Sequence, residues 1–291
     1  MMTRYSSLSD LLQRGGAALT KGPIALIFCE DQTELESTIR HHQKLGFRSV
    51  IALMQDEFPL EETLEAEIHR VTFDVAVDGA LASAVNTINA ASIGQWIYFC
   101  YNAEYLFFPF CESRSIGELL AYHAEERRDA MVTFVVDLYA EDLGQFSDAV
   151  HLDTAHFDRT GYYALAREDA DNSYHPLDRQ LDFYGGLRWR FEEHVPYMRR
   201  KIDRISIFRA KSGLKMRENH TFSDEEYNTY SCPWHHNMTA SIASFRTAKA
   251  LKRNPGSAEE ISTFLWANSV RFDWNSRQLM DLGLMEPGQW F

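Results

Sequence analysis

Acidic side chains stand directly after apolar runs in this 291-residue sequence. Glu30 and Asp31 follow the apolar residues 24–29, and Glu104 is the single acid in the apolar and aromatic residues 96–109. A carboxylate among apolar neighbours is costly to bury unless something pairs with it. Ligands of open α/β sheets bind where the strands end, so these acids are candidates for a binding site.

Each of these acids also has a structural interpretation. Glu104 contacts a metal or a sugar, or it pairs with an arginine such as Arg114 or Arg188 and holds two loops together. Asp31 contacts a ligand, or it is the N-cap of the next helix, with Glu34 three residues on. Capping is the simpler interpretation of Asp31.

Histidines late in the chain are candidate metal ligands beside Glu104. They are His220, His235 and His236. Adjacent side chains diverge, so the last two supply one ligand between them, and the alternative is a histidine hydrogen-bonded within a loop. His42 lies on the apolar stripe of an expected helix, which favours a satisfied core histidine.

Two arginines flank Trp189 after a pair of glycines, at positions 188 and 190. If this segment is a strand, alternation places Arg188 and Arg190 on one face and the indole on the other. Guanidinium groups bind phosphate or carboxylate with two hydrogen bonds, so the pair is a candidate donor or acceptor contact. The alternative is a solvated strand face.

The composition excludes some classes of protein. A formal net charge of −13 argues against a general nucleic-acid binder, which needs a basic face. The 4 cysteines lack paired spacing and are interpreted as reduced thiols. No apolar run is long enough to cross a bilayer. We expect a cytoplasmic protein, with peripheral membrane contact left open.

Apolar runs alternate with amphipathic segments, which predicts a mostly parallel sheet flanked by helices. Expected strands are residues 24–29, 49–54, 70–75, 96–100, 130–139 and 204–209. Expected helices are residues 32–45, 80–91, 239–253 and 258–269, and one that opens with a capping box at Ser115 and Glu118. Loops and a short hairpin are expected at 140–182. The division is a lead (1–22), a β/α half (23–140) and an elaborated C-terminal part (141–291) of one domain.

Four segments together resemble a bacterial subgroup of family 2-type glycosyltransferases, over roughly residues 24–255. The first is Cys29-Glu30 leading to the helix that contains His41-His42 and ends in Leu45-Gly46-Phe47. The second is residues 101–105, similar to the strand-end Asp-x-Asp-Glu-Phe motif. Tyr101 and Ala103 replace both aspartates, and Glu104 with Tyr105 matches. The third and fourth are residues 185–190 with Asn219-His220, and residues 235–249.

The resemblance implies a GT-A (Rossmann-like) fold with a nucleotide-binding half and an acceptor half. It implies a sugar transfer from a nucleotide-sugar donor to a glycan or small acceptor, with Glu30, Asp31, Asp56, Tyr101, Glu104, Arg188 and Arg190 at the donor. In that fold the aspartates hold Mg²⁺ or Mn²⁺ against the diphosphate. With both aspartates absent, a cation is expected only if Glu104 and the histidines hold it.

An inverting transfer also needs a carboxylate to take the acceptor proton. The acids available for that step are Asp137, Glu141 and Asp142, and the sequence does not choose among them. Two other functions stay open: a non-catalytic relative that binds carbohydrate or a partner, and a His/Glu metallohydrolase. No H-E-x-x-H spacing supports the metallohydrolase.

Overall fold

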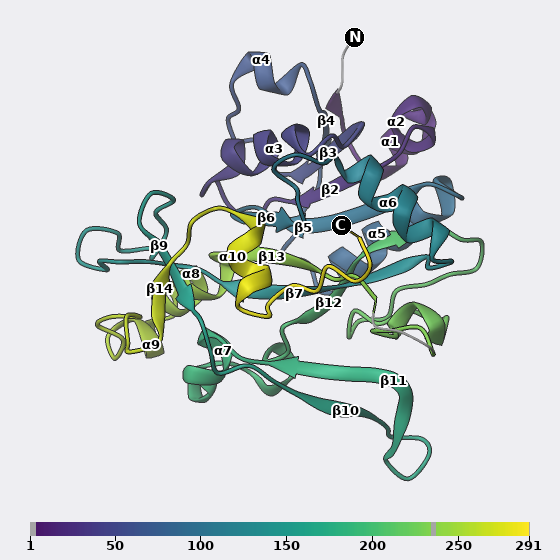
Figure 1. Cartoon of the computed structure of the whole chain (residues 1–291). Helices are drawn as coiled ribbons and strands as arrows, with labels where there is room; N and C mark the ends of the chain where they lie inside the picture. Colours follow the sequence, from purple (N-terminus) through teal and green to yellow (C-terminus); the bar gives the residue numbers. More distant parts are fainter. Residues whose placement is uncertain (1–3, 234–236, 291) are drawn as a thin grey trace. The chain divides into compact units, whose positions relative to one another are not determined.

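The computed structural model has a mixed α/β fold with a large, mainly parallel sheet flanked by helices (Figure 1). It describes residues 4–233 and 237–290. Two compact units share the chain and alternate along it. Unit 1 holds the residues up to Tyr105, residues 113–131 and residues 205–228. Unit 2 holds residues 106–112, residues 132–204 and the residues from Thr229 onward.

Most strands of unit 1 are parallel. They are β1 (Arg4–Tyr5), β2 (Ile24–Phe28), β3 (Ser49–Met54), β4 (His69–Thr72), β5 (Trp96–Tyr101) and β12 (Asp203–Arg209), which begins just before the unit. Their order is β1-β4-β3-β2-β5-β12, and only β12 runs antiparallel to its neighbour β5. Every residue of β2 and β3 is buried, as expected for central parallel strands covered on both faces.

Helices connect these strands. The helices of unit 1 are α1 (Leu8–Arg14), α2 (Gly16–Thr20), α3 (Leu35–Lys44), α4 (Glu62–Glu65), α5 (Ala80–Ala91), α6 (Ile116–Glu125) and the short η3 (Glu225–Asn228). After β2 the chain adds β3 and β4 on one side, and then returns to place β5 on the other side. The strand order therefore reverses between β2 and β5, which is the topological switch point of an open α/β sheet.

The sequence predicted several of these elements with the observed bounds. The strand at residues 49–54 and the helix at residues 80–91 are confirmed, and the capping box of Ser115 and Glu118 opens α6. The prediction that Asp31 caps α3 is wrong. Its carboxylate accepts the backbone N–H of Thr33 in a turn, so the helix begins only at Leu35.

Unit 2 contains the parallel pair β7 (Ala130–Asp137) and β13 (Ala240–Ser244), of which β7 begins in unit 1. A three-stranded antiparallel sheet has the order β14-β9-β8, and β10 and β11 form a long hairpin. The bounds are β8 (Tyr139–Ala140), β9 (Ala155–Asp158), β10 (Tyr163–Asp169), β11 (His175–Tyr184) and β14 (Ser269–Arg271); β6 (Glu104–Phe107) is divided between the units. The helices are α7 (Leu187–Arg190), η1 (Glu192–His194), η2 (Tyr197–Arg199), α8 (Arg246–Arg253), α9 (Pro255–Ala258) and α10 (Ser276–Asp281).

Of two helix predictions in unit 2, one is confirmed only for residues 246–253, which form α8, and the other is wrong. Residues 240–244 of the helix expected at 239–253 form β13 instead, because all five side chains are buried beside β7 and leave no polar face. The helix expected at 258–269 does not form; α9 ends at Ala258. There the Lys252 ammonium donates to the carbonyl oxygens of Ala258 and Ile261 at 2.8 and 3.0 Å. Those carbonyls are thus satisfied without a continuing helix.

Within residues 4–233 and 237–290, no helix is long and apolar enough to cross a bilayer.

Candidate functional site

Asn102 links the carboxyl ends of β2 and β5 at the switch point. Its side-chain oxygen accepts the backbone N–H of Glu30 at 2.8 Å. Its amide donates to Asp31 Oδ1 at 2.8 Å and to the carbonyl oxygen of Thr33 at 2.9 Å. The side chain is fully buried, so these bonds are shielded from water. The loop after β2 is therefore fixed to the end of β5.

Two carboxylates lie at this junction. Glu30 is exposed, and Asp31 is half-buried with Oδ1 held by Asn102 and by the N–H of Thr33 at 2.9 Å. Carboxylates at the edge of such sheets accept hydrogen bonds from ribose hydroxyls. The structure thus places both predicted acids at the carboxyl end of β2, beside the switch point.

Aromatic rings line the same end of the sheet. Phe28, the last residue of β2, packs its ring 5.9 Å from that of Tyr101 and 6.2 Å from that of Phe73. Phe28 is fully buried and Tyr101 nearly so, whereas Phe73 is half-buried. The Tyr101 ring is therefore part of a buried aromatic cluster at the carboxyl ends of β2 and β5.

Asp56 follows β3, one strand further along the sheet. It is exposed, and Oδ1 accepts the hydroxyl of Thr72 at 2.6 Å. The buried Arg70 guanidinium donates to the carbonyl oxygens of Gln55 and Asp56 at 3.0 and 2.7 Å. Backbone bonds to a buried cation hold this loop in place, so Asp56 is a fixed carboxylate on the same edge as Glu30.

Glu104 is buried, with 1% of its surface exposed. Its Oε2 accepts the backbone N–H of Tyr101 at 2.8 Å, across a turn in which Ala103 has a φ of 59°. The N–H of Ala103 donates to Thr38 Oγ1 at 2.9 Å. Glu104 therefore satisfies a buried backbone donor at the end of β5.

Of the expected metal ligands, the structure describes Glu104 and His220. His220 is half-buried in a turn with a φ of 64°, and its N–H donates to the carbonyl oxygen of Arg217. Among residues 4–233 and 237–290, no three His, Cys, Asp or Glu side chains are grouped as a metal site. His235 and His236 lie outside the described residues. Tyr101 and Ala103, which stand where the resembled Asp-x-Asp motif has its aspartates, offer no carboxylate.

Asp137 ends β7 in unit 2 and is buried with Arg188. Arg188 Nε is 3.4 Å from Asp137 Oδ1, and the backbone N–H of Arg188 donates to Oδ2 at 3.4 Å. Burial raises the pKa of Asp137 above its ordinary value, and the charge of Arg188 opposes that rise. Arg188 also donates to Thr247 Oγ1 and the carbonyl oxygen of Lys201.

Asp158, on β9, forms an ion pair with the second arginine, Arg190. Its Oδ1 accepts the Tyr139 hydroxyl at 2.6 Å, the Trp266 indole N–H at 2.7 Å and Arg190 Nη1 at 3.1 Å. The backbone carbonyl of Asp158 accepts the hydroxyl of Tyr162 at 2.8 Å. Arg190 also lies over the Trp266 ring, 4.7 Å from its centroid.

The strand predicted around Trp189 is wrong, because residues 187–190 form the short helix α7. The two arginines are each held by a carboxylate of unit 2 rather than aligned on one strand face. The other acids proposed for catalysis are exposed: Glu141 follows β8, and Asp142 Oδ1 accepts the N–H of Gly144 at 2.7 Å in a turn.

Sequence reasoning missed Asn102 and Arg70. Asn102 follows a buried strand directly, as Glu30 does, so the same rule could have found it. Arg70 lies inside β4 and donates to two backbone carbonyls, which leave no sequence signal, and to Glu65 Oε1 at 3.5 Å.

A shallow pocket of about 310 Å³ lies at the opposite edge of unit 1. Its lining includes Pro23, just before β2, Trp96, at the start of β5, and Arg209, at the end of β12. Ligands of open α/β sheets bind at the carboxyl ends of the parallel strands, so this pocket is at the wrong edge for the switch-point site.

Comparison with known proteins gives little further. No protein-family model matches the chain, and no curated protein does. A crystal structure of S. aureus TarS 1-349 in complex with UDP is similar over 39% of this chain and 35% of that chain, with 12% identity and a TM-score of 0.28. The chain thus matches about a third of that structure.

Proposed function

We propose that the chain binds a nucleotide-sugar at the switch point of unit 1 and transfers the sugar to a glycan or small acceptor. The observation that carries the proposal is the reversal of strand order between β2 and β5, with Glu30 and Asp31 at the carboxyl ends. Mononucleotides bind at this place in doubly wound sheets.

Each group at the edge has a role in this proposal. Glu30 and Asp31 accept hydrogen bonds from the ribose hydroxyls or the base, and Asp56 contacts the far end of the nucleoside. Phe73 and Tyr101 supply the apolar surface on which a base packs. The Asn102 bridge keeps the two loops in one arrangement before ligand arrives, which lowers the entropic cost of binding.

The fold family implies a divalent cation, and the described residues do not fit one. Glu104 Oε2 is engaged by the Tyr101 N–H, and Ala103 is buried with no ligand atom in its side chain. No step is therefore assigned to a metal. Among the acids of unit 2, Glu141 is exposed and suits a general base; Asp137 would need its ion pair with Arg188 to open.

Isothermal titration calorimetry with UDP, GDP and CDP, each with Mn²⁺ and with EDTA, tests the proposal. We expect one nucleotide to bind in both conditions. Asp31→Asn should weaken binding by roughly tenfold, the loss of one charged hydrogen bond. Glu62→Gln, an exposed acid of α4, is the matched control and should bind as the unchanged protein does. Absence of binding by all three nucleotides would remove the proposal.

A second function is favoured by Ala103. Ala103 has a φ of 59° and is completely buried. In the resembled family, the second aspartate of the motif at this position would instead face a ligand. A chain without both acids can keep the scaffold and bind carbohydrate without transferring it. Incubation with radiolabelled UDP-, GDP- and CMP-sugars separates the two functions, because release of free nucleotide or labelled product excludes the non-catalytic one.

A further inference from the structure

Unit 2 exposes large apolar side chains around the base of the β10–β11 hairpin. The exposed aromatic surface consists of Tyr163 (45% exposed), Leu165 (54%), Trp189 (41%), Tyr197 (67%) and Met198 (72%). Single exposed apolar residues are ordinary, but a contiguous group marks an interaction site. Three of the five carry aromatic rings with a polar atom, the residues that suit a partly wet binding surface.

The hairpin register aligns part of this surface. Tyr163 pairs with Tyr184 and Leu165 with Asp182, so these four side chains project from one face of the two strands. The rings of Tyr163 and Tyr184 stack, with centroids 5.2 Å apart and an interplanar angle of 18°. Burial, the charge of Asp182 and the adjacent Tyr197 hydroxyl raise the pKa of Tyr184, which places Tyr197 beside the stack.

Trp189 is held in place from beneath. Its neighbours Arg188 and Arg190 are tied to the buried carboxylates of Asp137 and Asp158. The indole lies over Gly161, where a Cβ would be 3.3 Å from the ring, so only glycine allows this approach. A side chain that is both exposed and fixed has already lost the conformational freedom that binding would otherwise remove.

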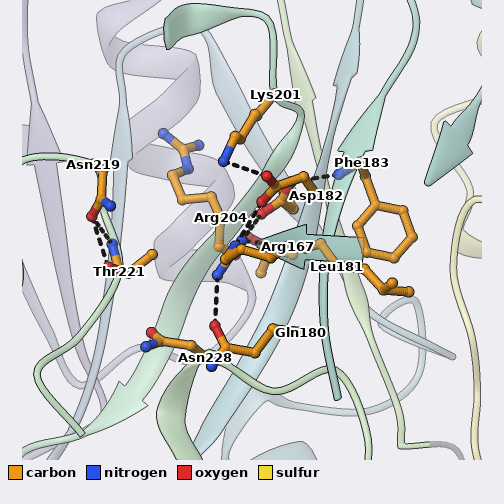
Figure 2. A network of polar contacts seen from close by, with 12 residues as sticks. Arg167, Gln180, Leu181, Asp182, Phe183, Lys201, Arg204, Asn219, Thr221 and Asn228 are labelled. Atoms are coloured by element: carbon orange, nitrogen blue, oxygen red, sulfur yellow. Dashed lines mark hydrogen bonds and ion pairs between the residues drawn. The ribbon is translucent and has the colours of Figure 1, made fainter. Parts of the chain in front are cut away.

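Charged groups occupy the same hairpin face. Arg167 Nε donates to Asp182 Oδ1 at 2.6 Å and Lys201 Nζ to Asp182 Oδ2 at 2.6 Å (Figure 2). Arg167 also donates to Asp203 Oδ2 at 2.8 Å. Two cations thus face two carboxylates, and the buried Arg204 belongs to the same network (Figure 2). Lys201 remains 34% exposed, which leaves ammonium hydrogens for a ligand.

We propose that the exposed aromatic surface binds the pyranose rings of a carbohydrate chain, the acceptor of the transfer. The inference rests on the proposed function, because it names the acceptor class of that reaction. The apolar C–H face of a pyranose packs on aromatic rings, and its hydroxyls bond to fixed charged groups such as those of Lys201 and Asp182. Tyr163 and Trp189 provide the rings.

Charge distinguishes this ligand from other occupants. An anionic membrane or a nucleic acid requires an excess of basic groups around the aromatic side chains. Here Arg167 and Lys201 are matched by Asp182 and Asp203, and the chain carries a formal net charge of −13. A neutral, hydroxyl-rich ligand is the complementary one.

Saturation-transfer NMR on the full chain with maltotetraose, cellotetraose and chitotetraose tests the inference. We expect pyranose C–H signals with at least one of these probes. Trp189→Ala and Tyr163→Ala should weaken its binding by roughly tenfold, as expected for a central aromatic contact. Tyr174→Ala is the matched control, since Tyr174 is an exposed tyrosine (66%) in the turn of the same hairpin. Circular dichroism and UDP calorimetry on each variant show that the fold and the nucleotide site are intact.

The outcomes separate this inference from the proposed function. Absence of signal with all three probes, or equal signals from the unchanged protein and Trp189→Ala, overturns it even if UDP binds. Self-association that Trp189→Ala abolishes, without any saccharide signal, also overturns it and assigns the surface to a second copy of the chain. Saccharide binding that depends on both rings supports it even if no nucleotide binds, and the proposed transfer is then the part that fails.

Discussion

Replacement of Asn102 tests the junction between β2 and β5 most directly. Asn102→Ala removes three hydrogen bonds, to the N–H of Glu30, to Asp31 Oδ1 and to the carbonyl oxygen of Thr33. A typical hydrogen bond contributes about 1 kcal/mol, and one to a charged group about 1.5–3 kcal/mol. We therefore expect the free energy of unfolding to fall by about 3.5–5 kcal/mol.

Asn102→Asp is the sharper change, because it keeps the volume and the oxygen that accepts the Glu30 N–H. It loses the amide that donates to Asp31 and places a second carboxyl beside it. Burial and the neighbouring charge raise the pKa of the introduced carboxyl above its unfolded value of about 3.9. The pH-dependent part of the penalty is therefore absent below about pH 4, grows as pH rises towards the folded pKa, and is constant above it.

Urea unfolding between pH 4.5 and 8 measures both variants against the unchanged protein. Hydrogen exchange of the segment 28–34 supplies a local readout, since the Glu30 amide loses its acceptor only in Asn102→Ala. A penalty for Asn102→Asp that stays constant with pH would refute the pairing with Asp31. An alanine variant as stable as the unchanged protein would refute the junction itself.

Glu104→Ala should lower the free energy of unfolding by about 2–4 kcal/mol, because the Tyr101 N–H loses the Glu104 acceptor. Glu104→Gln keeps an acceptor and should lower it by under about 1 kcal/mol. Thermal unfolding measures both variants. Burial lowers the pKa of His42 to about 3, so the stabilisation by the neutral ring is complete above pH 6.5 and is lost as pH falls, by about 1.4 kcal/mol per pH unit. Urea unfolding at pH 5–8 should show this dependence of the unfolding free energy on pH. A His42→Phe variant should lack it. Gly186→Ala should destabilise more than Gly213→Ala, because both have positive φ but only the first meets a carboxylate, 3.0 Å from the new Cβ.

Unit 1 was largely readable from the sequence, because its strands are buried on both faces. A continuous apolar run such as residues 49–54 indicates a buried strand, and the apolar stripe of residues 80–91 indicates a helix. The position of Glu30 at a strand end then followed from chain order alone. What the sequence did not reveal is that Asp31 serves a turn instead of a helix, since that depends on the distant Asn102.

Unit 2 was harder because its elements depend on contacts that are distant in the chain. Residues 240–244 show a helical stripe, yet burial against β7 makes them a strand. The hairpin was expected around residues 161–163, but the strands extend to Tyr184, with a turn after Asp169. The first strand is mostly exposed and the second mostly half-buried, so they lack the alternation by which a strand is recognised.

The buried carboxylates of the two units have different consequences. In unit 1, Asp31 is half-buried beside the exposed Glu30, so an acid is fixed without being sealed from a ligand. In unit 2, Asp137 and Asp158 are buried, and removal of either would leave a half-buried arginine without its carboxylate, which destabilises the fold. These two acids therefore position α7, which carries Trp189, and in the proposed function the exposed groups that they support meet the substrate. Burial, and not residue type, separates the acids that hold the site from those that can act in it.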